Sequence, residues 1–222
     1  MIKLVAFDWN GTLIADTKAT VDSVNEAIKL FPARPITVRD FQKNYDVPIY
    51  KFYQNIGVDI KGLMKKSRET QEVFHSYYEK RASKLSTRTG TRELLKHLSK
   101  EEINSIIFSN HIAHQIAKQL KRLDIDKYFI EILANDDLVT VLKSKTKEQK
   151  FKEFVSKSKF KPKEILIVGD YTEEVEIGKR MGAVTVAITN GVITRKRLKS
   201  ANPDYLINNL QEVIGIITKL NG

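Results

Sequence analysis

Short apolar runs that stop at polar residues recur along the chain, and three of them end in residues able to do chemistry. They are Leu4–Phe7 before Asp8, Ile106–Phe108 before Ser109 and Asn110, and Leu166–Val168 before Gly169 and Asp170. Runs of this length and composition, bounded by turn residues, predict buried strands. An aspartate in a tight turn after a strand is also common and carries no chemistry, so Asp8 alone leaves both interpretations open.

The remaining pattern alternates strands with helices. Ile130–Ala134 and Val184–Ile188 predict further strands, Glu93–Leu98 predicts a helix, and apolar residues from Leu206 to Ile217 predict a final amphipathic helix. Alternating strands and helices indicate an α/β fold with a doubly wound parallel sheet. In such a sheet the carboxyl ends of the strands share one edge, so we expect Asp8, Ser109 and Asp170 to converge there.

One long stretch departs from this alternation. Between Ile14 and Arg88 apolar residues recur at helical spacings and no strand pattern appears. The sequence therefore predicts a core formed by residues 1–14 and 88–222, with a helical cap, residues 15–87, inserted after the first strand. Its hinge is expected near residues 15–17. Aromatic residues in the cap are expected to form its core; they are Tyr45, Tyr50, Phe52 and Tyr53.

The polar strand ends resemble the motifs of the haloacid dehalogenase superfamily, most of whose members are phosphatases that work through an aspartyl-phosphate. Residues 8–13, Asp-Trp-Asn-Gly-Thr-Leu, match the first motif, Ser109-Asn110 the second, and Gly169-Asp170 with Glu174 the fourth. The resemblance covers nearly the whole chain. It implies a Rossmann-like core with a helical cap, as in the phosphoglycolate phosphatase and β-phosphoglucomutase-like branch. Lys145 fits the lysine motif, with Lys143 and Lys147 as alternatives.

The resemblance implies a role for each matched residue. Asp8 would be the nucleophile, and Mg²⁺ would be bound by Asp8, Asp170 and the backbone carbonyl of Asn10, with Glu174 orienting metal-bound water. Phosphate would be bound by Ser109, Asn110 and Lys145. Chemistry supports this set independently, because a phosphate ester needs a fixed nucleophile, a hard cation and donors around its oxygens.

Asn10 departs from the family pattern. The phosphatases of the family carry a second aspartate there, which protonates the leaving group and later activates water. An amide cannot transfer that proton, and a lost general acid typically costs ~10²–10⁴ in rate. The sequence therefore predicts a Mg²⁺-dependent hydrolase or phosphotransferase of a small phosphorylated metabolite. The alternatives are a catalytically weakened phosphate-binding or regulatory protein and, since Trp9 resembles the phosphonoacetaldehyde-cleaving branch, a phosphonatase.

Composition adds little that is specific. The net charge of +11 suggests a polyanion-binding surface, but the basic residues are scattered among acids, so a solvated lysine-rich surface is the preferred interpretation over nucleic-acid binding. The chain has no cysteine and no apolar stretch of membrane-spanning length, so we expect a cytoplasmic protein, monomeric or homodimeric, with no membrane partner.

Overall fold

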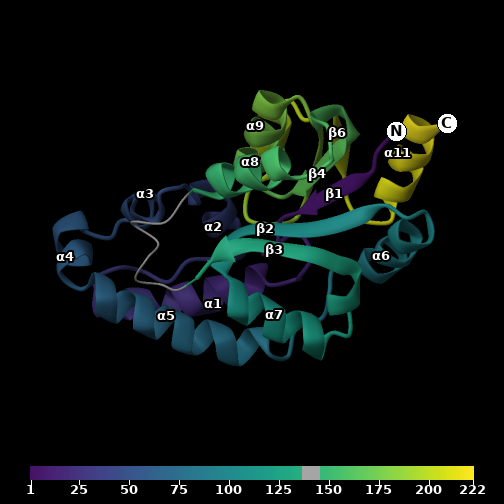
Figure 1. The fold of residues 1–222 in the computed structure, drawn as a ribbon. Helices are drawn as coiled ribbons and strands as arrows, with labels where there is room; N and C mark the ends of the chain where they lie inside the picture. The colour runs from purple at the N-terminus through teal and green to yellow at the C-terminus, as the bar shows by residue number, and fades with distance from the viewer. Residues whose placement is uncertain (137–145) are drawn as a thin grey trace.

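Six parallel strands form the centre of the molecule, in a computed structural model that describes residues 1–136 and 146–222. The strands are β1 (Leu4–Phe7), β2 (Asn104–Ile112), β3 (Phe129–Asn135), β4 (Ile165–Gly169), β5 (Val184–Ile188) and β6 (Tyr205–Ile207). Their order in the sheet is β3-β2-β1-β4-β5-β6. The chain thus starts in the middle and winds outward in both directions, as Figure 1 shows, which confirms the predicted doubly wound sheet.

Helices cover both faces of this sheet, which is why the central strands are apolar on both sides. Along β1, Val5 and Phe7 pack into one cluster with α6, α7 and α11, whereas Leu4 and Ala6 pack into another with α8 and α9. The covering helices are α6 (Thr91–Lys100), α7 (Ala113–Arg122), α8 (Lys147–Lys157), α9 (Thr172–Met181), α10 (Arg195–Ser200) and α11 (Glu212–Asn221). Short 3-10 turns span Ile28–Leu30, Asp126–Tyr128 and Pro162–Glu164.

Between β1 and α6 the chain forms a helical insertion. Its helices are α1 (Thr17–Ala27), α2 (Val38–Asn44), α3 (Ile49–Asn55), α4 (Ile60–Lys65) and α5 (Ser67–Ala82). They surround an apolar cluster of their own that includes Phe41, Phe52 and Tyr53, and α1 runs beside α5 (Figure 1). Tyr50, expected in that core, is 38% exposed.

The two connections to the insertion lie side by side. Ile14 forms an antiparallel bridge with Thr87, the Ala15 amide donates to the Ser86 carbonyl, and the Arg88 amide donates to the Leu13 carbonyl. The chain therefore leaves the core and returns to it at neighbouring points.

Two boundaries differ from those the sequence pattern predicts. The final helix begins at Glu212, because Leu206 belongs to β6, the edge strand; a three-residue strand is too short to produce a period-2 signal. The strand expected to end at Phe108 continues to Ile112, past a register shift between Phe108 and Ile112, so Ser109 and Asn110 lie in β2. None of the described helices has the length and apolar character needed to cross a bilayer.

Candidate active site

Asp8, Ser109 and Asp170 lie together at the carboxyl edge of the sheet. Phe7 pairs with Ile107 of β2 and with Val168 of β4, so the residues that follow these three positions are brought to one level. All three polar side chains are buried. The sheet register thus places chemically capable groups from distant parts of the sequence in one site.

Lys147 joins this group through two ion pairs. Its Nζ lies 2.7 Å from Asp8 Oδ1, pairs also with Glu174 Oε1, and sits 4.5 Å from the centre of the Phe108 ring. The side chain is only 2% exposed. Of the three candidate lysines, Lys147 therefore contacts Asp8, whereas Lys143 and the preferred Lys145 lie outside the described residues. We call Asp8, Lys147, Asp170 and Glu174 the strand-end cluster.

The start of α8 fixes the position of Lys147. Thr146 precedes the helix, and its hydroxyl accepts a hydrogen bond from the Gln149 amide while the Gln149 side chain accepts one from the Thr146 amide. This reciprocal capping motif makes Lys147 the first helical residue. The threonine and glutamine, three residues apart, are a sequence signal that would have selected Lys147.

Asp170 is held in a close-fitting backbone cradle. Its Oδ1 accepts a hydrogen bond from the Thr12 hydroxyl (3.0 Å) and its Oδ2 accepts one from the Val192 amide (2.6 Å). A Cβ added at Gly11 would lie 2.1 Å from Asp170 Oδ2, and one at Gly191 would lie 2.0 Å from it. Gly11 also has φ +70°, so both backbone conformation and space require glycine at that position.

The strand-end cluster carries more negative than positive charge. Burial, followed by repulsion from Asp8 and Glu174, raises the pKa of Asp170 well above its usual range. Burial raises the pKa of Glu174 to about 7, although Lys147 opposes this shift. Burial alone would lower the pKa of Lys147, but attraction to Asp8 and Glu174 outweighs it and the pKa is raised. The cluster thus holds three carboxyl groups and one ammonium group, which pairs with Asp8 and Glu174, and this excess of acid favours a further cation.

The oxygen atoms at this edge suit Mg²⁺. Two carboxylates, Asp8 and Asp170, with a backbone carbonyl such as that of Asn10, form the hard, oxygen-only donor set that Mg²⁺ prefers. Asp8 Oδ2 accepts no hydrogen bond from the residues that the structure describes. Residues 1–136 and 146–222 contain no group of three His, Cys, Asp or Glu side chains arranged around a metal. A bound Mg²⁺ would therefore depend on backbone, substrate and water for its other ligands.

Ser109 and Asn110, the residues of the second motif, have different hydrogen-bond partners. Ser109 is buried, and its Oγ accepts a hydrogen bond from the His111 amide (3.2 Å). Asn110 donates instead from its side chain to Glu173 (2.9 Å). His111 lies against α5 with Nε2 3.6 Å from Glu79. The longer β2 explains this position, because it moves the helix start to Ala113.

Asn10 belongs to a different network. Its side-chain nitrogen donates to Asp16 Oδ2 (2.7 Å) and to the Tyr78 hydroxyl (2.6 Å), and that hydroxyl donates to Asp16 Oδ2 (2.7 Å). Asp16 Oδ1 accepts from the Gly11 amide (2.7 Å). Burial raises the pKa of Asp16, against the effect of these hydrogen bonds. We call Asn10, Asp16 and Tyr78 the loop–insertion cluster; the sequence interpretation missed Asp16 and Tyr78.

Arg88 was also missed. Its guanidinium donates to the carbonyls of Gly11 and Thr189 (2.7 Å for the latter), linking the β1 loop to the loop after β5. Burial lowers the pKa of Arg88, while attraction to Asp170 and Asp16 opposes that shift. The positive charge of Arg88 is therefore close enough to interact with the carboxyl groups of Asp170 and Asp16.

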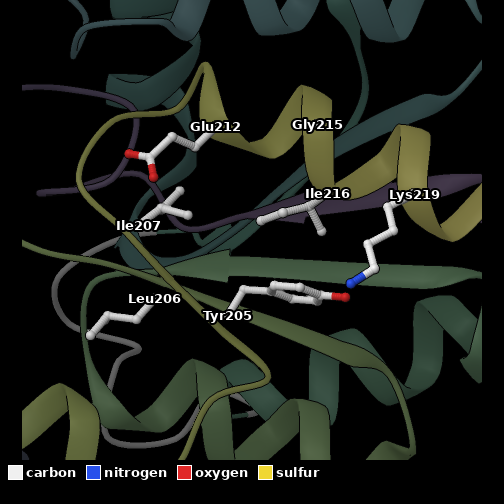
Figure 2. Close-up of a pocket in the computed structure, with 7 residues that line it drawn as sticks. All are labelled: Tyr205, Leu206, Ile207, Glu212, Gly215, Ile216 and Lys219. Carbon is white, nitrogen blue, oxygen red and sulfur yellow. The ribbon is translucent and has the colours of Figure 1, made fainter.

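A groove lies away from this site. It has a volume of about 320 Å³ and lies between β6 and α11, and Figure 2 shows the residues that line it. It is lined by Tyr205, Leu206, Ile207, Glu212, Gly215, Ile216 and Lys219. None of these residues belongs to the strand-end cluster, and Glu212 Oε1 already accepts hydrogen bonds from the Asn208 and Asn209 amides. The groove therefore offers no comparable set of reactive groups.

Comparison with known proteins identifies the family. A family model described as haloacid dehalogenase-like hydrolase matches residues 5–188, a span that includes both clusters. The chain belongs to the haloacid dehalogenase-like hydrolases. Both the predicted resemblance and the predicted enzyme class, a hydrolase, are thereby confirmed.

Relatives among the haloacid dehalogenase-like hydrolases match end to end. A phosphoglycolate phosphatase of Vibrio vulnificus is 23% identical over 222 residues, covering 97% of this chain and 96% of the relative. A pyrophosphatase PpaX of Bacillus mycoides is 22% identical over 221 residues, covering 100% and 99%. A haloacid dehalogenase-like protein from Streptococcus pneumoniae has the same fold, with a TM-score of 0.81 at 18% identity, covering 97% and 98%.

Proposed function

We propose that the protein is a Mg²⁺-dependent phosphatase of a small phosphorylated metabolite, with Asp8 as the nucleophile. The observation that carries the proposal is the buried ion pair between Lys147 and Asp8, continued to Glu174. A carboxylate held at a strand end beside a fixed ammonium suits attack on a phosphoryl group, whose charge the ammonium offsets. The names of the phosphatase and pyrophosphatase relatives support the same class.

In this proposal Asp8 forms a bond to phosphorus as the bond to the leaving oxygen breaks, giving an aspartyl-phosphate that water later hydrolyses. Lys147 neutralises charge on Asp8 and on the phosphoryl oxygens, and the Ser109 hydroxyl donates to one of those oxygens. Bound Mg²⁺, held by Asp8, Asp170 and the Asn10 carbonyl, would supply further charge neutralisation. Glu174 keeps Lys147 in place and would orient metal-bound water.

Asn10 restricts which substrates react well. Its amide cannot protonate a leaving group, and its nitrogen is already bonded to Asp16 and Tyr78. Substrates whose leaving group departs without proton transfer, such as acyl phosphates, aryl phosphates and diphosphates, should therefore phosphorylate Asp8 faster than alkyl phosphates do. We also propose that the helical insertion acts as a cap that excludes water and selects substrates, since it joins the core directly beside Asp8.

The test is phosphate release from a panel of acyl, aryl and alkyl phosphates and diphosphate, with Mg²⁺ and with Mg²⁺ chelated. We expect Mg²⁺-dependent turnover of acyl phosphates, aryl phosphates and diphosphate, and a phosphoryl label on Asp8, detected by mass spectrometry. Calorimetric titration should show Mg²⁺ binding that Asp170→Ala abolishes. Turnover that persists in Asp8→Asn would refute the assigned nucleophile.

The bonding of Asn10 also favours a second candidate, a phosphate-binding or regulatory protein with little turnover. That protein would bind phosphate compounds and Mg²⁺ at the same site, yet release no phosphate from any class in the panel. The same experiment therefore distinguishes the two functions.

A further inference from the structure

Asn10 is followed by Gly11, a pair of residues with its own chemistry. The backbone nitrogen after an asparagine can attack the side-chain amide carbon and close a five-membered succinimide ring, and glycine leaves that nitrogen unhindered. The reaction is slow unless a base removes the amide proton and an acid protonates the leaving nitrogen. The question is whether the fold supplies both.

Asp16 contacts both nitrogen atoms involved. Its Oδ1 lies 2.7 Å from the Gly11 backbone nitrogen, which would be the nucleophile. Its Oδ2 lies 2.7 Å from Asn10 Nδ2, which would be the leaving group. The Tyr78 hydroxyl, 2.6 Å from Asn10 Nδ2, gives the leaving nitrogen a second neighbour able to exchange a proton. Asp16 is only 1% exposed, so these contacts occur away from bulk water.

We propose that Asn10 is a self-modification site, at which Asp16 promotes conversion of the amide to a carboxyl group. The Gly11 nitrogen forms a bond to Asn10 Cγ while its proton passes to Asp16 Oδ1. The bond from Cγ to Nδ2 then breaks. The proton that the Asp16 carboxyl group gained moves from Oδ1 to Oδ2 and passes to Nδ2, which leaves as ammonia. Asp16 ends the step unchanged.

Water completes the reaction. It adds to a carbonyl of the succinimide and the ring opens, leaving aspartate at position 10 if the bond to the Cγ carbonyl breaks and isoaspartate if the other breaks. Overall, one amide and one water give one carboxyl group and one ammonia, with no change of oxidation state.

Two other asparagine–glycine pairs in the chain provide internal controls. Asn190 is exposed and precedes Gly191, and Asn221 ends α11 before Gly222. The Gly222 amide donates to the Thr218 carbonyl, and in the described part of the chain neither glycine nitrogen donates to a carboxylate. The same dipeptide thus occurs with and without the Asp16 arrangement.

The modification would change the position at which the proposed active site lacks a proton donor. Position 10 is where Asn10 replaces the aspartate that the family resemblance leads us to expect, so an aspartate formed there would restore a proton donor. This consequence rests on the proposed function, whereas the conversion itself does not. Freshly made protein would then be the poorly active form, and conversion would activate it.

The experiment follows the three asparagines in the full chain by peptide mass spectrometry after incubation in water labelled with heavy oxygen. We expect label and loss of ammonia at position 10 faster than at position 190 in folded protein, and equal rates in protein unfolded by urea. Asp16→Ala and Asp16→Ser should slow conversion at position 10 by ~10²-fold, the usual contribution of one acid–base group. Asn10→Gln, which closes a less favourable ring, is the matched control that stays unlabelled.

Two outcomes would overturn the proposal. One is that the ratio of the conversion rate at position 10 to the rate at position 190 is no larger in folded than in unfolded protein. This comparison uses the wild-type chain, so it needs no variant to fold. The other is a folded Asp16→Ser protein, verified by circular dichroism, that converts as fast as wild type. The fractions of aspartate and isoaspartate at position 10 are measured on the same samples as the activity. Conversion to aspartate without a gain in alkyl phosphate turnover would count against the proposed function alone.

Discussion

The strand-end cluster and the loop–insertion cluster both contain a buried aspartate, yet they are built on opposite plans. In the first, Asp8 and Glu174 share one ammonium group, that of Lys147, and the buried Asp170 adds a third carboxyl group. In the second, neutral donors surround the single carboxylate of Asp16: an amide, a hydroxyl and a backbone N–H. The first arrangement leaves acidic groups available for a cation. The second uses its hydrogen bonds internally and joins the core to the insertion.

The largest expected effect is on chemistry at the strand-end cluster. Asp8→Asn removes the nucleophile while keeping the size of the side chain, so turnover should fall by ~10⁴-fold or more. Phosphate release from an acyl phosphate measures it. Asp124→Asn, at a carboxylate whose side chain is 78% exposed, is the control and should leave turnover unchanged. Comparable turnover in both variants would break the assignment of the site.

Lys147→Ala tests the charge balance itself. The variant leaves Asp8 and Glu174 buried without their cation, which should lower the free energy of unfolding by about 3–5 kcal/mol. Urea unfolding measures this loss. Lys157→Ala removes an exposed pair with Glu153 from the same helix and should cost less than about 1 kcal/mol. Equal losses would show that the Lys147 pairs are no stronger than surface ones.

Tyr78→Phe tests the loop–insertion cluster in the same way. The variant keeps the ring but removes the hydroxyl between Asn10 and Asp16, so we expect a loss of about 1–3 kcal/mol in the free energy of unfolding. Tyr77→Phe, at a neighbouring residue that is 40% exposed, is the matched control. A loss no larger than that of the control would mean that the cluster contributes nothing to stability.

A smaller effect concerns pH. The pKa of Glu174 is about 7 in the folded protein against 4.5 ordinarily, so between these values the folded state binds more protons than the unfolded state. Its contribution to stability is therefore complete below about pH 4.5 and is lost as pH rises toward 7. Asp170 acts with the same sign.

Urea unfolding of wild type and Glu174→Gln across this pH range isolates the effect. The decline in stability with rising pH should be shallower in Glu174→Gln, because glutamine does not titrate. Glu176→Gln, on the exposed side of α9, should keep the wild-type slope. A slope in Glu174→Gln that matches wild type would contradict the raised pKa.

The position of a residue could be predicted from the sequence where the sheet determines it, but not where the packing of other elements determines it. Asp8 and Asp170 follow apolar strands, and parallel strand ends share an edge, so their convergence could be predicted from the pattern alone. The lysine could not be chosen without locating the start of α8, and the Thr146–Gln149 capping signal that does so was overlooked.

The loop–insertion cluster lay beyond such reasoning. Asp16 and Tyr78 are separated by 62 residues, and they meet because α5 packs beside α1. No periodicity records that contact. The edge strand β6 was missed for a related reason, since it is defined by its pairing with β5 and is only three residues long.

The bridge between Ile14 and Thr87 holds the two ends of the insertion side by side. Because the chain leaves the core and returns at neighbouring points, a different segment whose ends lie equally close could be spliced there without disturbing the sheet. In the proposed function, related proteins could therefore change their substrates by altering or exchanging that segment. Asp8 and Asp170 would keep their positions in an unchanged sheet.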